Sequence, residues 1–272
     1  MKTSSRTKKR LISIVLTVIF LTTPALAATY TLVSVNYPIL VNGEAMTFTD
    51  AEPMNYDGRT MLPLRAVSEA LEVSIEWDGE QVVIETIDLE ALKESCVMIY
   101  CGKDGYYENQ GSGVIIDYDE ILTCFHVIDD KDYFEILYNA SDSSEIGYEV
   151  DLLDTAESKD SAILTTPDTD VKPVKIGDSD EVEIGDRVYI ISSPHENKNT
   201  VTSGEVLCFA NLISDDDSIP GFVVSADSAT GSSGGACFNA KGELIGILQI
   251  GLDEGNESGI IPINDLRKAL AA

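Results

Sequence analysis

The feature that most restricts the fold of this chain is a long series of short apolar runs separated by polar turns. The runs cover 97–101, 113–117, 121–125, 133–138, 148–153, 161–165, 187–192, 202–210, 222–226 and 243–251. Short strands at this spacing are typical of an all-β sandwich or barrel. The sequence therefore predicts a mainly β domain over 96–272, ending in a helix over 263–271 with Asn264 as its N-cap.

Charge restricts the partners of the chain. It has 272 residues and 44% hydrophobic residues, which is enough for a packed core. The 18 basic residues against 47 acidic ones give a net charge of −29. A nucleic-acid partner is excluded, because phosphate binding needs a basic stripe.

The first 27 residues have the pattern of a secretory signal peptide. The first ten residues are rich in Lys and Arg, the run 11–21 is apolar, and Ala25 and Ala27 place small residues where a signal peptidase cleaves. The apolar run is short for a membrane span, which needs about 20 residues. We expect an exported, extracytoplasmic protein at a bacterial surface; an uncleaved membrane anchor remains the alternative.

Residues 29–87 form a separate segment, whose pattern combines short strands, hairpin turns and one helix. Short strands are expected at 31–35 and 39–41, with Asn42-Gly43 as a hairpin turn. Apolar residues at helical spacing follow Pro63, which suits a first helical turn. A second hairpin, 74–77 with 81–85, would close on Asp78-Gly79. The segment is predicted to be a small α+β domain, joined by a helical linker over 88–95 to the β domain.

The strings ILVNGEAMTF (39–48), DGRTMLPLRAVSEAL (57–71) and VSIEWDGEQVVI (73–84) resemble the copper amine oxidase N-terminal-like domain of exported bacterial proteins. The resemblance implies an accessory module that makes cell-wall or surface contacts. It does not imply copper, because the segment 29–87 holds no histidine or cysteine, the ligands that copper prefers.

The cysteines leave two interpretations open. The five residues are Cys96, Cys101, Cys124, Cys208 and Cys237. An odd number in an exported chain leaves at least one thiol outside an internal disulfide, and the pairing cannot be read from sequence. Buried free thiols are the alternative. There is no CxxC pair and there are only two histidines, so no metal site and no cofactor is expected.

The turn Gly231-Ser232-Ser233-Gly234-Gly235 carries a candidate nucleophile. A serine flanked by glycines can sit in a tight turn whose backbone amides converge on one point, as an oxyanion hole requires. Such a turn alone is also typical of a linker.

Two further side chains complete a candidate catalytic set. His126 follows the apolar run ILTCF (121–125) and is expected at a strand end, whereas His195 lies in a polar loop. Histidine is the base available near neutral pH for activating a serine. Asp160 leads directly into an apolar strand, where a carboxylate needs a partner. A structural histidine and a turn aspartate are the alternatives.

The order His126, Asp160, Ser233 is that of chymotrypsin-type proteases, and residues 96–272 resemble the protease domain of HtrA-like (DegP-type) enzymes. The resemblance is carried by GSGVIIDYDEILTCFHVI (111–128), KDSAIL (159–164), IGDSDEVEIGDRVYIISSP (176–194), VTSGEVL (201–207), TGSSGGACFNAKGELIGI (230–247) and IIPIND (260–265). It implies the trypsin fold, two six-stranded antiparallel β-barrels with the Ser-His-Asp triad between them. It also implies an oxyanion hole from the amides of Gly231 and Ser233.

Some residues depart from the family pattern or leave specificity open. Cys124-Phe125 stands where two small residues often precede the histidine, and Ser232 replaces the usual acid or amide before the nucleophile. Asp227 has the spacing of an acidic pocket floor for Arg or Lys, although an HtrA-like pocket would instead take small apolar side chains. No PDZ domain is expected after the protease domain.

The sequence thus predicts a serine endopeptidase that acts on protein or peptide substrates. A protease fold that binds partners without catalysis is the alternative. The oligomeric state is not predicted.

Overall fold

The structure, a computed structural model, describes residues 32–41, 43–71, 73–77, 79–138, 147–167, 170–214, 217–252 and 256–270. The predicted signal segment 1–27 lies outside the described residues. The chain divides into two compact units, Met1–Pro38 with Thr47–Pro63, and Ile39–Met46 with Leu64–Ala272. This division falls inside the segment 29–87, and each unit is described by itself.

The first unit contains a three-stranded antiparallel sheet in the order β1 (Val33–Ser34), β4 (Met54–Tyr56), β5 (Arg59–Met61). Strands β4 and β5 are joined by Asp57 and Gly58, which both have positive φ, at 47° and 73°. Asp-Gly is a favoured pair for a two-residue hairpin turn because both positions require this conformation. The turn signal was present in the sequence, but this hairpin was not among the predicted strands.

The second unit begins with small elements that match the sequence pattern. Strands β2 (Leu40–Val41) and β3 (Glu44–Ala45) pair as the predicted hairpin, and the predicted helix is α1 (Leu64–Ala70). Strands β6 (Ser74–Trp77) and β7 (Val82–Glu85) form the second hairpin. The predicted helical link is α2 (Leu89–Glu94), which begins at Asp88, whose carboxylate accepts a hydrogen bond from the amide of Ala91 at 3.1 Å.

Seven strands then form the first large sheet, in the order β12-β11-β8-β9-β10-β14-β13. Their bounds are β8 Cys96–Lys103, β9 Tyr106–Asp117, β10 Glu120–Thr123, β11 Tyr133–Tyr138, β12 Tyr148–Glu149, β13 Leu152–Ala156 and β14 Ser161–Thr165. The two edge strands, β12 and β13, follow each other in the chain. Between them, Val150 N–H donates to Phe134 O, and Asp151 O accepts from Thr165 N–H. The sheet therefore rolls up, with β12 and β13 acting as one broken closing strand.

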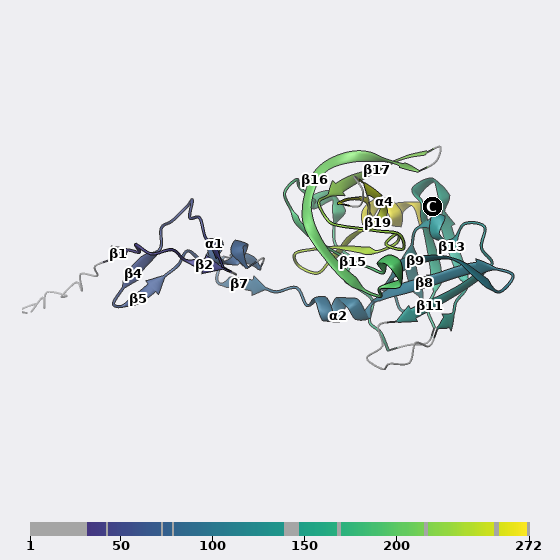
Figure 1. The fold of residues 1–272 in the computed structure, drawn as a ribbon, viewed down its shortest axis with the longest axis horizontal. Helices are drawn as coiled ribbons and strands as arrows, with labels where there is room; N and C mark the ends of the chain where they lie inside the picture. The colour runs from purple at the N-terminus through teal and green to yellow at the C-terminus, as the bar shows by residue number, and fades with distance from the viewer. Residues whose placement is uncertain are drawn as a thin grey trace, which may run out of the picture. The chain divides into compact units, whose positions relative to one another are not determined.

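The second barrel is closed by hydrogen bonds in the order β15-β16-β17-β20-β19-β18. Its strands are β15 Arg187–Ser192, β16 Thr200–Ser214, β17 Asp217–Val224, β18 Ala236–Asn239, β19 Leu244–Leu252 and β20 Glu257–Pro262. The long strand β16 arches around it (Figure 1). Strands β18 and β20 were not among the predicted runs, since each is short and follows a polar stretch. The predicted mainly β fold with two barrels is confirmed.

Three short 3₁₀ turns, at Glu157–Lys159, Ser179–Glu181 and Pro194–Glu196, connect the strands, and helix α4 (Ile263–Leu270) packs against β13 and β19. Ile263 and Leu266 are fully buried there.

The prediction that Asn264 caps this helix is wrong. Its amide N–H donates to Ser179 Oγ at 3.1 Å and its side chain donates to Asp178 Oδ1 at 2.7 Å. The cap thus comes from Ser179, which no local pattern could indicate.

Phe238 on β18 tests how far the second barrel depends on its core. Its side chain is 0% exposed, whereas that of Phe209 on β16 is 56% exposed. Phe238→Ala removes buried apolar surface and leaves a cavity, so unfolding should become easier by about 3–5 kcal/mol. The control Phe209→Ala should cost at most about 1.5 kcal/mol, from its ring contact with Phe222. Urea unfolding followed by circular dichroism measures both free energies, and equal costs would contradict the assigned core.

Candidate active site

A buried carboxylate holds one of the two histidines. Asp160 is 2% exposed and lies between the turn Glu157–Lys159 and strand β14. Its Oδ1 accepts the backbone N–H of His126 at 2.8 Å, and its Oδ2 lies 2.7 Å from His126 Nδ1. The two bonds fix both the position and the ring orientation of the histidine. With Nδ1–H donating to the carboxylate, Nε2 is left as the basic nitrogen.

The backbone around His126 differs from the strand end that the sequence predicted. Strand β10 stops at Thr123, and His126 lies in the short helix α3 (Phe125–Ile128) that follows it. The prediction that His126 ends a strand is therefore wrong. Asp160 itself has left-handed backbone angles, φ 47° and ψ 49°, a conformation that aspartate tolerates better than most residues. The side chain of His126 remains 41% exposed, so its ring is accessible from solvent.

Ser233 lies in the turn between β17 and β18, in the second barrel. Its Oγ donates to Gln249 O at 3.2 Å, and among the described residues it makes no hydrogen bond with His126. Its carbonyl accepts from Ser112 N–H on β9 at 2.8 Å, while Gly234 N–H donates to Leu248 O at 2.8 Å. The turn is thus held between strands of both barrels.

Gly234 could not be replaced without moving the backbone. It has φ +84°, and a Cβ there would lie 2.1 Å from Ser112 O and 2.5 Å from Thr123 Oγ1. A glycine is required because the serine turn passes so close to the first barrel.

The two peptide groups that carry the amides of Gly231 and Ser233 have fixed orientations. Thr230 O accepts from His195 N–H at 2.8 Å, and Ser232 O accepts from Gly235 N–H at 2.9 Å. Within the described part of the chain, the amides of Gly231 and Ser233 donate to no protein acceptor. Since N–H and C=O point in opposite directions across a trans peptide, bonding of the carbonyls also orients these amides. Two such free amides can bind an oxyanion.

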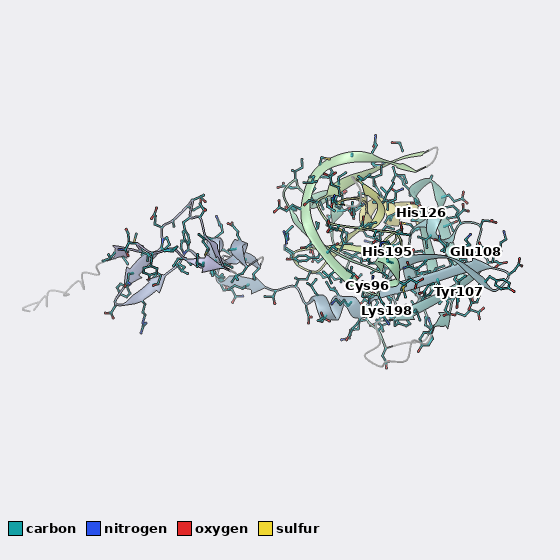
Figure 2. All side chains as sticks on the ribbon, in the orientation of Figure 1. Cys96, Tyr107, Glu108, His126, His195 and Lys198 are labelled. Carbon is teal, nitrogen blue, oxygen red and sulfur yellow. The ribbon has the colours of Figure 1, made fainter. Side chains whose placement is uncertain are left out.

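His195 contributes through its main chain. It lies with φ 49° in the turn Pro194–Glu196, its side chain is exposed, and Figure 2 labels it apart from His126. Its amide holds the carbonyl of Thr230 as described above. The sequence interpretation of His195 as a polar loop residue agrees with this placement.

Ser112 is a site residue that the sequence reasoning missed. It is 1% exposed, and its Oγ donates to Gly231 O and accepts from Ser193 N–H at 2.8 Å. Neighbouring Gln110 adds a 2.7 Å bond from its side-chain amide to Ser193 O. A serine between two glycines in an apolar strand was the only signal, and it does not reveal partners more than 80 residues away in sequence.

Asp227, the specificity candidate, is exposed on the surface. Its carbonyl accepts from Thr202 Oγ1 at 3.0 Å. An acidic pocket floor would be enclosed. The preference for Arg or Lys stays a prediction.

The structure answers the question that the cysteines left open. All five are free, and only Cys208 is exposed. Burial raises the pKa of Cys101 to about 11 and also raises the pKa of Cys96 and of Cys237. Burial, together with the charge of Asp160, raises the pKa of Cys124 well above its ordinary value. The buried cysteines are neutral thiols, two of which donate hydrogen bonds, Cys101 to Val127 O at 2.9 Å and Cys124 to Leu248 O at 3.3 Å.

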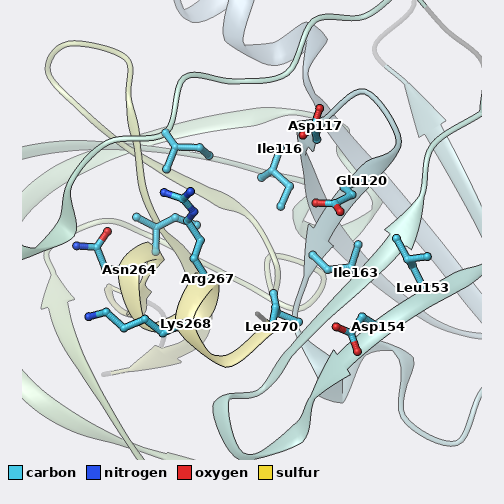
Figure 3. A pocket seen from close by; sticks show the side chains of 12 residues that line it. Ile116, Asp117, Glu120, Leu153, Asp154, Ile163, Asn264, Arg267, Lys268 and Leu270 are labelled. Atoms are coloured by element: carbon cyan, nitrogen blue, oxygen red, sulfur yellow. The ribbon is translucent and has the colours of Figure 1, made fainter. Parts of the chain in front are cut away.

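A cavity of about 770 Å³ lies away from these groups, between α4 and the first barrel (Figure 3). Arg267 and Lys268 line one wall, and the acidic side chains of Asp117, Glu120 and Asp154 line another. Burial, and after it the negative charges of Asp119, Asp117 and Asp154, raises the pKa of Glu120. His126, Asp160 and Ser233 do not line this cavity.

Two family models match parts of the chain. Residues 111–247, half of the chain, match the trypsin-like peptidase domain family. Residues 40–112 match the copper amine oxidase N-terminal domain, a range that starts later and ends later than the predicted 29–87. Among the described residues, no helix has the length and apolar character of a membrane span.

Similar curated proteins carry the description "probable periplasmic serine endoprotease DegP-like". One from Pseudomonas fulva is 35% identical over 147 residues, which are 54% of this chain and 30% of the relative. One from Pseudomonas putida is 36% identical over 141 residues, 52% of this chain and 29% of the relative. The chain therefore covers less than a third of the length of these relatives.

Two solved structures have the same fold. The HtrA-type protease AlgW with a tripeptide has a TM-score of 0.59 at 22% identity, covering 66% of this chain and 60% of its own. The active form of the Rv3671c protease from M. tuberculosis has a TM-score of 0.60 at 18% identity, covering 69% and 87%.

Ser112→Ala tests the link between the two barrels. It leaves the carbonyl of Gly231 and the amide of Ser193 buried without that partner, so unfolding should become easier by about 1–3 kcal/mol. Ser218→Ala, at an exposed position on β17, should change the free energy of unfolding by no more than about 0.5 kcal/mol. Chemical denaturation compares the free energies of unfolding of the two variants with that of the wild type. A Ser112→Ala variant as stable as the wild type would contradict the role given to this hydroxyl.

Proposed function

The chain belongs to the trypsin-like peptidase family, and on this premise we propose that it is an extracytoplasmic serine endopeptidase. The observation that carries the proposal is the buried carboxylate of Asp160 bonded to both the backbone and the ring of His126. The glycine turn around Ser233 and its two free amides support it. The similar proteins described as periplasmic serine endoproteases are consistent with it.

In the proposed mechanism, Ser233 Oγ attacks the carbonyl carbon of a peptide bond. His126 Nε2 takes the hydroxyl proton, and Asp160 stabilises the imidazolium that forms. The amides of Gly231 and Ser233 bind the negative charge on the carbonyl oxygen. His126 then gives the proton to the leaving amine, and water hydrolyses the acyl-enzyme by the same route.

The hydroxyl of Ser233 has to change its partner in this mechanism. It donates to Gln249 O at 3.2 Å in the free chain, and proton transfer requires a bond to His126 Nε2. Catalytic hydrogen bonds commonly tighten only when substrate is bound. We infer that substrate binding turns the hydroxyl from Gln249 toward His126.

The accessory segment is proposed to contact the cell wall or another surface. In the second unit, the hairpin β6–β7 leaves Trp77, Val82 and Ile84 65%, 47% and 54% exposed. Exposed apolar clusters of this kind are typical of interaction sites. If Trp77 takes part, Trp77→Ala should weaken retention of the full chain on purified cell-wall material; equal retention of both proteins would count against it.

Labelling by a fluorophosphonate tests the nucleophile. The wild-type chain should be labelled and should cleave peptides, whereas Ser233→Ala should lose both because no hydroxyl remains to attack. Ser232→Ala, which removes the adjacent serine, should retain labelling and serves as the control. A wild-type protein that is folded but takes no label would contradict the enzyme and favour the non-catalytic binding protein.

Asp160→Asn tests the orienting carboxylate. The amide can hold the ring, but it favours the tautomer whose Nε2 carries the proton, so kcat near neutral pH should fall on the order of 10⁴-fold. Peptide hydrolysis measures the rate, and near-ultraviolet circular dichroism checks that the fold is retained. A loss below about tenfold would show that Asp160 does not act on His126 during catalysis.

Peptide reporters test the pocket. If Asp227 binds a cationic side chain, reporters ending in Arg should be cleaved faster than those ending in Val or Ala, and Asp227→Asn should remove the difference. Equal or faster cleavage after Val would contradict the acidic pocket.

A further inference from the structure

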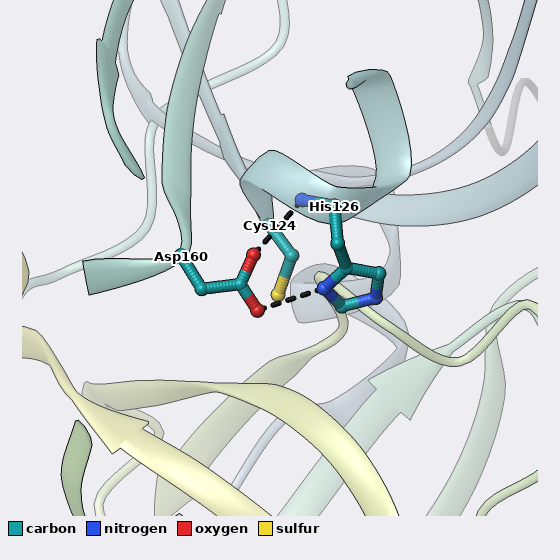
Figure 4. Close-up of side chains that lie close together, drawn as sticks. All are labelled: Cys124, His126 and Asp160. Atoms are coloured by element: carbon teal, nitrogen blue, oxygen red, sulfur yellow. Dashed lines mark hydrogen bonds and ion pairs between the residues drawn. The ribbon is translucent and has the colours of Figure 1, made fainter. Parts of the chain in front are cut away.

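Three side chains, one of them His126 itself, bring possible metal-ligand atoms close together near the candidate active site. The ligand atoms of Cys124, His126 and Asp160 all lie within 4.8 Å of one another. In Figure 4 the thiol of Cys124 and the carboxylate of Asp160 both face the edge of the ring that carries Nδ1. The mechanism proposed above uses the histidine and the aspartate but gives the thiol no role.

The three donors are held in place by the surrounding chain. Cys124 and His126 come from the junction between β10 and α3, and Asp160 is anchored through Oδ1 by the His126 amide at 2.8 Å. Cys124 is 0% exposed, and its thiol donates a hydrogen bond to Leu248 O at 3.3 Å. The side chain of His126 is 41% exposed, whereas Asp160 is 2% exposed. Donors fixed in this way reduce the entropy that a bound ion would have to overcome.

The chemistry of the set suits zinc. Zn²⁺ binds thiolate sulfur, imidazole nitrogen and carboxylate oxygen, and many sites use three protein ligands and a water molecule. Burial of the sulfur, and after it the negative charge of Asp160, raises the pKa of Cys124, so the thiol keeps its proton when no metal is bound. A divalent cation balances the charges of a thiolate and of this carboxylate, so it favours the thiolate that it binds.

We propose that Cys124, His126 and Asp160 form an inhibitory zinc site, an inference that rests on the proposed protease function for its effect on activity. The thiol of Cys124 releases one proton to solvent and binds Zn²⁺ through sulfur. The proton of His126 moves from Nδ1 to Nε2 as Nδ1 binds the ion. An Nε2 that carries a proton cannot accept one from Ser233, so the bound ion stops the first step of catalysis.

The metal-binding spacing rules used on the sequence could not find this cluster. Two of the ligands are two residues apart, but Asp160 lies just before strand β14, 34 residues after His126.

Inhibition by ZnCl₂ of peptide hydrolysis by the full chain tests the effect on activity. Each protein is compared with its own metal-free rate. Cys124→Ala should raise the half-inhibitory zinc concentration by about 100-fold or more. The substitution removes a metal ligand, and loss of a residue that only supports a ligand already lowers metal affinity by about 10–100-fold. Cys208→Ala, at the exposed cysteine, should leave it unchanged. Added chelator should restore the wild-type rate. Equal inhibition of the wild type and Cys124→Ala would overturn the proposal.

A cobalt titration tests the site without any need for activity. Co²⁺ bound to a thiolate gives a near-ultraviolet charge-transfer band, which should appear with the wild type, with Ser233→Ala and with Cys208→Ala. The band should be absent with Cys124→Ala. If the band appears but the wild-type chain cleaves nothing, the protease function fails and the metal site stands. If the chain is active and no band appears, the metal site is wrong and the protease function stands.

Discussion

The hydrogen-bonded pair of His126 and Asp160 is the interaction on which the rest of the site depends. A carboxylate that is 2% exposed is stable only if its charge is compensated, and it receives both the amide and the ring of His126. This pairing fixes where α3 must begin and where β14 must enter the first barrel. The second barrel then supplies the serine turn, and Ser112 joins the two halves by contacting Gly231, Ser193 and, through its amide, Ser233. The candidate active site is thus assembled by a few buried polar contacts between two apolar cores.

Sequence alone gave the strand series and the fold class, because apolar runs between turns are a local signal. It did not give the closing strands β18 and β20, or the break between β10 and α3, where tertiary contacts decide the path of the chain. Asn264 was assigned as a cap from its residue type, whereas Ser179 occupies that role across 85 residues. The partnership of Asp160 with His126 came from family resemblance, and Ser112 and Cys124 were missed as site residues because their partners are distant in sequence.

One carboxylate can serve two states of the same site. Bonded to Nδ1–H, Asp160 keeps His126 basic at Nε2; joined with the thiolate of Cys124 around a cation, it would hold the opposite tautomer. The difference between the two states is the position of one proton on the ring. In the first state the thiol of Cys124 is neutral and donates to Leu248 O, so His126 and Asp160 keep their own hydrogen bonds.

The central claim, that Ser233 is the nucleophile activated by His126, is tested most directly by locating a trapped acyl group. The full chain would be acidified during turnover of a slowly hydrolysed activated ester, digested and analysed by mass spectrometry. The account predicts one acyl group on the peptide containing residues 231–235, with fragmentation assigning it to Ser233. An acyl group on another side chain, such as Cys124 or Ser232, or steady turnover with no trapped adduct, would contradict it.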